Sequence, residues 1–221
     1  MRSVNQSTLF NNRFFFDLDH VTKGGNKEDY YTPERKIGAF DNQKKWETCD
    51  ILVDYHTWSF MLNNPGLPAK KIIRDLINVV DNGGNYLLNV GPDEYGNIRA
   101  EDESVLLDIG TWLSANAESI YNTDAGPYLS STSVSSSHKG NNIYLHALDQ
   151  AGKELTIPEV PYNTLEIIET LDGKAIAFTH SGKKYHISIK EADKQGITTL
   201  KMTFKDKFPK ISPKKELIAT K

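Results

Sequence analysis

Residues 67–92 decide the fold class, and they read LPAKKIIRDLINVVDNGGNYLLNVGP. Pro68 stands where a helix can begin, because the first turn does not need the N–H group that proline lacks. The apolar residues that follow recur at helical spacing and form one face: Ile72, Ile73, Leu76, Ile77 and Val80. Gly83 and Gly84 end the helix, since a left-handed cap favours glycine. A nearly continuous apolar strand follows over 86–90, which is typical of a parallel sheet covered on both faces.

Similar segments flank this helix and strand. Residues 14–16 and 46–53 each predict a short strand, and the first is expected to be buried. A second helix is predicted after residue 100, with Val105, Leu106, Ile109, Trp112 and Leu113 on its buried side. Strands and helices that alternate at this spacing predict an α/β domain over residues 1–125.

The pattern changes near Asp124. Residues 127–141 are rich in Ser, Thr and Gly, which predicts a linker, and the serines at 135–137 belong to it rather than to a nucleophile. Short β-type runs follow at 143–148, 155–157, 165–171, 175–179, 184–189 and 198–204, with a hairpin turn expected at 180–183. No segment with helical period interrupts them, so residues 126–221 are predicted to form an antiparallel β-sandwich domain.

Composition narrows the classes of partner. The chain has 221 residues, a formal net charge of −3 and one cysteine. A near-neutral chain argues against nucleic acid as the main partner, because phosphate binding needs a concentrated basic surface. No apolar run approaches the roughly 20 residues that cross a bilayer, and the first residues lack the apolar core of a signal peptide. We therefore expect no membrane partner.

Metal and disulfide chemistry have little support in the sequence. Cys49 has no second cysteine to pair with. The six histidines show no spacing typical of metal ligands: His20, His56, His138, His146, His180 and His186. We expect no metal and no organic cofactor.

Two glutamates lie beside aromatic residues and are candidates for acid–base chemistry. Glu34 follows Pro33, which stiffens the loop, and Tyr30 and Tyr31 could exclude water and raise a carboxyl pKa as a general acid requires. The alternative is an ordinary surface glutamate. Glu47 lies in the strand predicted over 46–53, where an unpartnered carboxylate is costly.

Two further residues suit carbohydrate chemistry. Glu47 requires a ligand or an arginine as its partner, and Arg13 is a candidate for that role, or for a clamp on hydroxyl and carboxylate groups. Trp58 lies in a loop with other aromatic residues, where its ring could stack on the apolar face of a sugar or pack in the ordinary way. These residues favour carbohydrate chemistry without identifying a sugar.

Three motifs carry a resemblance to a known family. They are WETCDILVDYHTWSF at 46–60, LPAKKIIRDLINVVDNGGNYLLNVGPDEYGNI at 67–98, and LLDIGTWLSANAESIYNT at 106–123. In this order they closely resemble the family 29 α-L-fucosidases, over residues 11–123. The resemblance implies a (β/α)₈-like (TIM) barrel followed by a β-sandwich. It also implies hydrolysis of terminal α-L-fucose with retention, by two carboxyl groups about 5–5.5 Å apart.

The same resemblance implies roles for individual residues. Glu34 is the first choice for the acid/base, and Glu47 is the alternative acid/base or a support for it. Arg13, Trp46 and Trp58 are implied to contact the substrate, with Trp58 forming an aromatic wall against the C5 methyl group of fucose. The family's SWGY-like loop reads TWSF here, so that its glycine is Ser59.

The family's nucleophile precedes the NNR motif at residues 11–13, so the resemblance implies that no nucleophile is on this chain. If one were, Asp17, Asp19 and Asp29 would be the candidates. We expect a C-terminal portion that lacks the first half of the barrel and is inactive alone. The alternative is a non-catalytic carbohydrate-binding or degenerate remnant of such an enzyme.

The expected partner is a fucosylated oligosaccharide or a glycoprotein glycan. A half-barrel also exposes strand edges, so a homo-oligomer or association with the missing N-terminal half is expected. Cytoplasmic, periplasmic and extracellular locations are all compatible with the single cysteine, and the resemblance implies a periplasmic, secreted or lysosomal parent enzyme.

Overall fold

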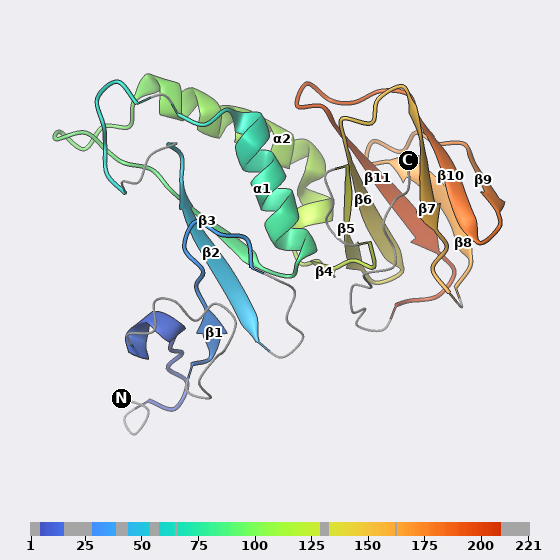
Figure 1. The fold of residues 1–221 in the computed structure, drawn as a ribbon, viewed down its shortest axis with the longest axis horizontal. Coiled ribbons are helices and arrows are strands. Elements are labelled where there is room, and N and C mark those ends of the chain that lie inside the picture. The colour runs from blue at the N-terminus through green and yellow to red at the C-terminus, as the bar shows by residue number, and fades with distance from the viewer. Residues whose placement is uncertain are drawn as a thin grey trace.

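The computed structural model describes residues 5–15, 28–38, 44–53, 58–64, 66–128, 133–161 and 163–208. Two helices lie between a small parallel sheet and a pair of antiparallel sheets (Figure 1). The N-terminal part is thus α/β and the C-terminal part is all-β, as the sequence predicts.

The parallel sheet has three strands in the order β1-β2-β3. They are β1 (Tyr30–Tyr31), β2 (Lys45–Ile51) and β3 (Asn85–Asn89). Both pairings are parallel, and Cys49 of β2 lies opposite Leu87 of β3. Helix α1 (Ala69–Asp81) joins β2 to β3, which is the crossover that parallel neighbours require.

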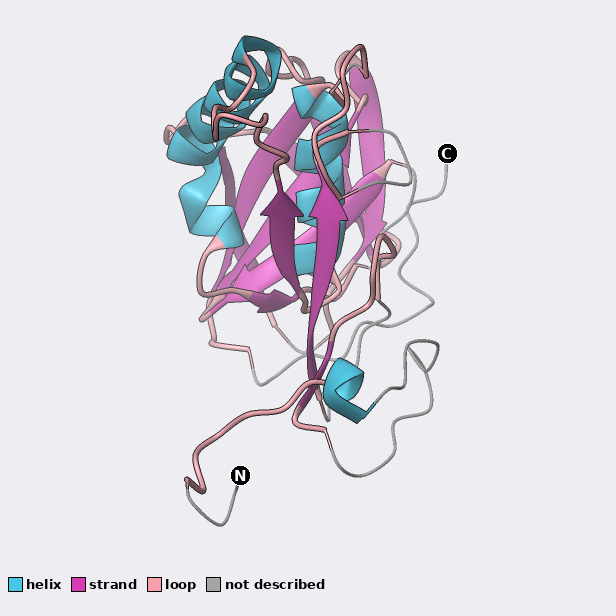
Figure 2. Ribbon diagram, turned by 90° about the vertical axis from the view of Figure 1, so that its left-hand side faces the viewer, coloured by secondary structure: helices cyan, strands magenta, loops and turns pink. Residues whose placement is uncertain are grey.

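One face of this sheet is covered and the other is not. Tyr86 and Leu88 pack against the helices, whereas Leu87, on the opposite face, is 52% exposed. The prediction of a strand covered on both faces is therefore wrong for the second face within the described part of the chain. Figure 2 looks onto the parallel strands, with a helix behind them.

The two helices form as their apolar spacing predicts. Pro68 is the N-cap of α1, and Gly83 follows its end with φ 76°, a left-handed conformation that glycine adopts without strain. Helix α2 (Ala100–Ile120) begins after Arg99, whose guanidinium pairs with Asp102 at 2.8 Å. The shared core of the helices includes Ile72, Ile73, Ile77, Ile109 and Trp112, together with Leu148 and Ile197 of the C-terminal part.

The strand predicted over residues 14–16 is wrong where the structure describes it. Asn12–Phe15 form a 3₁₀ helix, η1. Asn12 explains the turn, because its Oδ1 accepts hydrogen bonds from Thr32 N (2.8 Å) and Thr32 Oγ1 (3.0 Å). This side chain thus bonds the start of η1 to the segment after β1. Phe16 lies outside the described residues.

The C-terminal part is an antiparallel β-sandwich, which confirms the prediction. Its five-stranded sheet has the order β4-β5-β6-β11-β8, and its three-stranded sheet the order β7-β10-β9. The first comprises β4 (Asp124–Ala125), β5 (Val134–Lys139), β6 (Asn142–Leu148), β11 (Ile197–Phe204) and β8 (Leu165–Thr170). The second comprises β7 (Lys153–Pro158), β10 (Lys184–Ile189) and β9 (Phe178–Ser181). The turn predicted at 180–183 is confirmed only at Gly182 and Lys183, both with positive φ. His180 and Ser181 belong to β9, which begins at Phe178 and not at residue 175 as predicted.

The linker predicted over residues 127–141 is wrong at 134–139, which form β5. Ser135, Ser136 and Ser137 are completely buried. Ser137 Oγ donates to the Ser119 carbonyl at 2.7 Å, and Ser136 Oγ to the Tyr128 carbonyl at 3.0 Å. Small hydroxyl side chains are typical of linkers, but here backbone acceptors satisfy two of the three.

A buried polar network joins the sandwich to the helices. His146 of β6 contacts Asp81 Oδ2 through Nδ1 at 3.1 Å and Ser119 Oγ through Nε2 at 3.2 Å. The side chains of both His146 and Asp81 are 0% exposed. Trp112 Nε1 adds a hydrogen bond to Asp193 at 2.8 Å. These contacts fix how the two parts of the chain lie against each other.

Candidate functional site

An ion pair between Arg13 and Glu34 is the centre of the candidate site. Arg13 Nη2 lies 2.9 Å from Glu34 Oε2, and the two side chains are 33% and 41% exposed. Arg13 is held from two further directions, since its Nε donates to Thr32 Oγ1 at 3.0 Å and its Nη2 to Cys49 Sγ at 3.0 Å. A half-exposed carboxylate with a fixed guanidinium beside it can be reached by a ligand.

The backbone around Glu34 is bonded to β2. Arg35 N donates to Cys49 O at 2.8 Å, and Cys49 N donates to Pro33 O at 3.1 Å, so that Glu34 forms a parallel bridge with Cys49. Thr48 Oγ1 reinforces this contact by donating to Lys36 O at 2.7 Å. Arg35 has φ 53°, the left-handed conformation that most side chains avoid. The loop therefore presents Glu34 in one direction.

Cys49 is a positioning residue that the sequence analysis did not assign to the site. Burial raises the pKa of its thiol, and the charge of Arg13 opposes that rise. The neutral thiol can then accept the hydrogen bond from Arg13 while facing Pro33 O at 3.9 Å. Thr32 was also missed, because only the folded chain brings it to Arg13.

Glu47 lies on the same face of β2 as Cys49, since side chains two residues apart share a face. It is opposite Asn85 of β3. The prediction that Arg13 is the partner of Glu47 is wrong, because Arg13 pairs with Glu34. In the segments that the structure describes, the carboxylate of Glu47 has no hydrogen bond or ion pair.

Trp46 lies apart from this group, on the covered face of β2. Its side chain is 3% exposed, and its Nε1 donates to Asn82 O at 3.3 Å. The indole packs against Gly38, where an added Cβ would come within 2.8 Å of the ring, and against Gly84. The structure thus places Trp46 in the core and does not bring it together with Arg13 and Glu34.

Trp58 is 39% exposed and lies beyond the C-terminal end of β3. Its backbone is fixed there, because Asn89 Nδ2 donates to Trp58 O at 3.1 Å. Gly91 allows the segment after β3 to approach Phe60 closely, since a Cβ at position 91 would lie 2.5 Å from Phe60 N. The exposed indole thus lies at the carboxyl end of a parallel strand, which is where α/β folds usually bind their ligands.

Of the two aromatic residues before Glu34, Tyr31 carries an ammonium group over its ring. The Lys44 ammonium lies over the Tyr31 ring, 5.0 Å from its centroid, and pairs with Glu28 at 2.7 Å. Tyr30 and Tyr31 are both half-buried in β1. Among the described residues, Arg13 is instead the group that contacts the Glu34 carboxylate.

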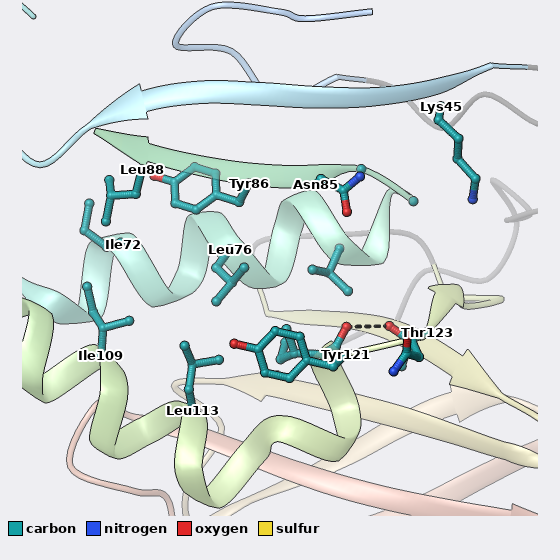
Figure 3. Close-up of a pocket in the computed structure, with 15 residues that line it drawn as sticks. Lys45, Ile72, Leu76, Asn85, Tyr86, Leu88, Ile109, Leu113, Tyr121 and Thr123 are labelled. Atoms are coloured by element: carbon teal, nitrogen blue, oxygen red, sulfur yellow. Dashed lines mark hydrogen bonds between the residues drawn. The ribbon is translucent and has the colours of Figure 1, made fainter. Parts of the chain in front are cut away.

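A separate pocket of about 630 Å³ lies between α1, β3 and α2 (Figure 3). Leu76, Leu88, Leu113 and Tyr121 contribute much of its apolar wall, and Lys45 lies at one end. None of its lining residues is Asp or Glu. We therefore do not assign acid–base chemistry to this pocket.

The described residues hold no group of three or more His, Cys, Asp or Glu side chains that could bind a metal ion. Neither α1 nor α2 is long and apolar enough to cross a membrane.

Sequence comparisons give a consistent set of relatives. The family model described as Alpha-L-fucosidase matches residues 2–118. The chain is 34% identical over 121 residues to the alpha-L-fucosidase of Dictyostelium discoideum, a match that spans 54% of this chain and 25% of the relative. It is 40% identical over 80 residues to the tissue alpha-L-fucosidase of Homo sapiens, spanning 35% of this chain and 17% of the relative.

Solved structures resemble the fold over nearly the whole chain. Alpha-L-fucosidase isoenzyme 1 from Paenibacillus thiaminolyticus has a TM-score of 0.77 at 24% identity, covering 93% of this chain and 52% of that one. The Thermotoga maritima alpha-fucosidase in complex with fucose has a TM-score of 0.71 at 21% identity, covering 91% and 46%. This chain thus spans about half the length of these structures and a quarter or less of the two curated relatives.

Proposed function

Because this chain belongs to the α-L-fucosidase family, we propose that it forms the C-terminal half of a retaining enzyme that releases terminal α-L-fucose from glycans. The observation that carries the proposal is the Arg13–Glu34 ion pair, in which Arg13 Nη2 and Glu34 Oε2 lie 2.9 Å apart. The parallel β1-β2-β3 sheet and its crossover helix are the portion of a (β/α)₈-like barrel that this chain contributes.

Glu34 is the proposed acid/base. In retaining glycosidases one carboxyl group protonates the leaving oxygen and then, as a carboxylate, activates the water that hydrolyses the intermediate. Glu34 suits this exchange because its side chain is 41% exposed and its Oε2 is oriented by Arg13. Arg13 is also placed to bond a sugar hydroxyl once substrate enters.

Glu47 and Trp58 complete the proposed sugar contacts. Glu47 either supports Glu34 or takes the acid/base role itself, since it shares the Cys49 face of β2. Trp58 offers an indole that is 39% exposed to the apolar side of fucose. The proposal leaves Trp46 out of the contacts, because its ring is in the core.

The nucleophile in this proposal comes from the other half of the barrel. Asp29 is committed to the fold, as its Oδ2 accepts a hydrogen bond from Phe10 N at 2.7 Å, and Asp17 and Asp19 lie outside the described residues. An acid/base without a nucleophile forms no glycosyl-enzyme intermediate. The chain alone is therefore expected to be inactive.

Hydrolysis of an aryl α-L-fucoside tests the proposal. The chain is assayed alone and after co-expression with the N-terminal half of the Paenibacillus thiaminolyticus relative, as wild type, Glu34→Gln and Glu47→Gln. We expect no turnover alone, turnover in the co-expressed complex, and a loss of about 10²–10⁴-fold in Glu34→Gln.

Three outcomes would go against the proposal. Full activity of the Glu34→Gln complex would remove Glu34 from the acid/base role, and a loss confined to Glu47→Gln would transfer the role there. A well-formed complex that binds fucose without hydrolysing the aryl fucoside would favour the alternative, a carbohydrate-binding remnant.

A further inference from the structure

A second pocket, of about 370 Å³, lies at the rim of the β-sandwich. Its walls come from β9, β10, residues 159–160 and residues 163–165, and it includes Phe178, His180 and Tyr185. None of these residues belongs to the Arg13–Glu34 site. A volume of this size is in the range of small-molecule sites.

Three rings line this pocket. The Tyr185 centroid lies 6.1 Å from that of Phe178, at an interplanar angle of 81°, and 4.9 Å from that of His180, at 35°. Phe178 and His180 are two residues apart on β9 and so share a face, and Tyr185 of β10 lies directly opposite His180. Phe178 also packs on the sandwich core. The rings are thus held in fixed positions by strand pairing and core contacts.

Polar groups meet these rings at the pocket. His180 Nε2 lies 2.8 Å from Glu159 Oε2. Tyr185 is 3% exposed as a whole residue and lines the pocket, so a ligand there can meet only a small part of it. Burial, with a smaller contribution from Glu159, raises the Tyr185 pKa, which keeps the hydroxyl neutral.

The pocket is already formed without a ligand. Asn163 closes its loop onto the end of β11, because Asn163 Nδ2 donates to Asp206 O at 2.8 Å and Asp206 N donates to Asn163 Oδ1 at 3.1 Å. Glu159 N is bonded to Lys183 O at 2.9 Å, which fixes the other end of the loop to the β9–β10 turn. Little ordering entropy therefore opposes binding.

We propose that this pocket binds one pyranose ring of a neutral glycan, as a site separate from the Arg13–Glu34 site. Aromatic rings accept the C–H face of a sugar, while the Glu159 carboxylate accepts hydrogen bonds from its hydroxyls and the Tyr185 hydroxyl can donate or accept. The Glu159 carboxylate disfavours an acidic sugar. The ligand class rests on the proposed function, and fucose and its neighbouring sugars in a fucosylated glycan are all neutral candidates.

The test is an NMR titration of the ¹⁵N-labelled chain with methyl α-L-fucoside and, separately, methyl β-D-galactoside. We expect amide shifts at residues 159, 160, 163, 164, 178–181 and 185, with a dissociation constant of roughly millimolar order, as a single small ring allows. Tyr185→Phe removes only the hydroxyl and should weaken binding by about fivefold to tenfold. His180→Ala should weaken it at least as much.

Thr179→Ala is the matched control, because Thr179 is an exposed residue of the same strand whose side chain points to the opposite face. It should leave the titration unchanged. Shifts around Arg13 and Trp58 without shifts at this pocket would overturn the proposal, as would no shifts at all or an equal loss in the control. Binding at this pocket needs no hydrolysis, so a co-expressed complex that stays inactive while the chain still shows these shifts would count against the fucosidase proposal alone.

Discussion

Replacing Asp81 by alanine should destabilise the chain more than any surface substitution near it. Asp81 and His146 have side chains that are 0% exposed and lie 3.1 Å apart between α1 and β6. Removing one partner of such a buried pair leaves the other desolvated and without its contact, which costs about 3–5 kcal/mol. The cost should lie toward the lower end, because Asp81 Oδ1 is buried without a partner in the described chain and its desolvation penalty is relieved by the substitution.

A loss of about 3 kcal/mol corresponds to a fall in Tm of about 6–12 °C for a chain of this size. Scanning calorimetry measures it, with Lys174→Ala as the control. Lys174 forms an ion pair with Asp172 on the surface, where the two side chains are 77% and 61% exposed, so its removal should leave the Tm unmoved. Asp81→Asn should fall between the two, since its amide oxygen can still accept a hydrogen bond from His146.

The reasoning is refuted if Asp81→Ala shifts the Tm no more than Lys174→Ala does. A double-mutant cycle with His146→Ala adds a second check. The sum of the two single losses in stability should exceed the loss in the double variant, because both single substitutions remove the same interaction. Strict additivity would mean that the two side chains do not stabilise each other.

Three other substitutions or measurements have definite expected results. Gly84→Ala should lower the free energy of unfolding in urea by about 1–3 kcal/mol, because the new Cβ overlaps the Trp46 indole. Gly110→Ala in α2, with open space around it, should instead raise it by about 0.5–1 kcal/mol. Equal effects of the two substitutions would contradict the packing at Gly84. Hydrogen bonds from Arg74, and then Lys70, lower the Asp149 pKa, so the stability that they contribute is present above about pH 4 and lost as the pH falls further. Below about pH 4 the Asp149→Asn variant should therefore lose less stability than the wild type does, by well under 1 kcal/mol because the group is half-exposed. The same dependence of stability on pH in both proteins would count against these hydrogen bonds. Burial raises the Cys49 pKa, so iodoacetamide should alkylate the folded chain several-fold more slowly than the urea-unfolded chain at about pH 8; equal rates would show that the thiol is not protected.

The helices could be predicted from the sequence because the apolar residues that recur at helical spacing are the same residues that pack in the core. Ile72, Ile73 and Ile77 read as one helical face, and each is at most 1% exposed in the core of α1. The family was identified correctly from three motifs for a related reason, since each motif spans a whole element with its glycine and proline boundaries.

The serine run at 135–137 shows where local pattern fails. Its side chains are small and polar, so nothing within the run indicates burial. Strand pairing with β6 places them inside, and acceptors from distant residues satisfy Ser136 and Ser137. A pattern read along the chain does not contain those acceptors.

The candidate site was predictable as a set of residues but not as a set of contacts. Arg13 and Glu34 were both chosen, yet Arg13 was considered as a partner of Glu47 or as a clamp on hydroxyl and carboxylate groups, and not as the partner of Glu34. The choice between two glutamates depends on how the loop at 33–36 is bonded to β2, which involves Cys49 and Thr48 across the sheet. Such contacts between sequence-distant residues arise only from tertiary folding.

The left-handed backbone at Arg35 limits which amino acids this position can accept. Glycine, asparagine and aspartate reach φ near 53° at little cost, whereas a β-branched residue there is strained by about 1–2 kcal/mol. Valine or isoleucine at 35 would therefore turn the preceding carboxylate away from Arg13 or weaken its bridge to β2. In a saturation library at this single codon, selected for fucoside cleavage by the complemented enzyme, the surviving amino acids would rank by their tolerance of positive φ rather than by charge or size.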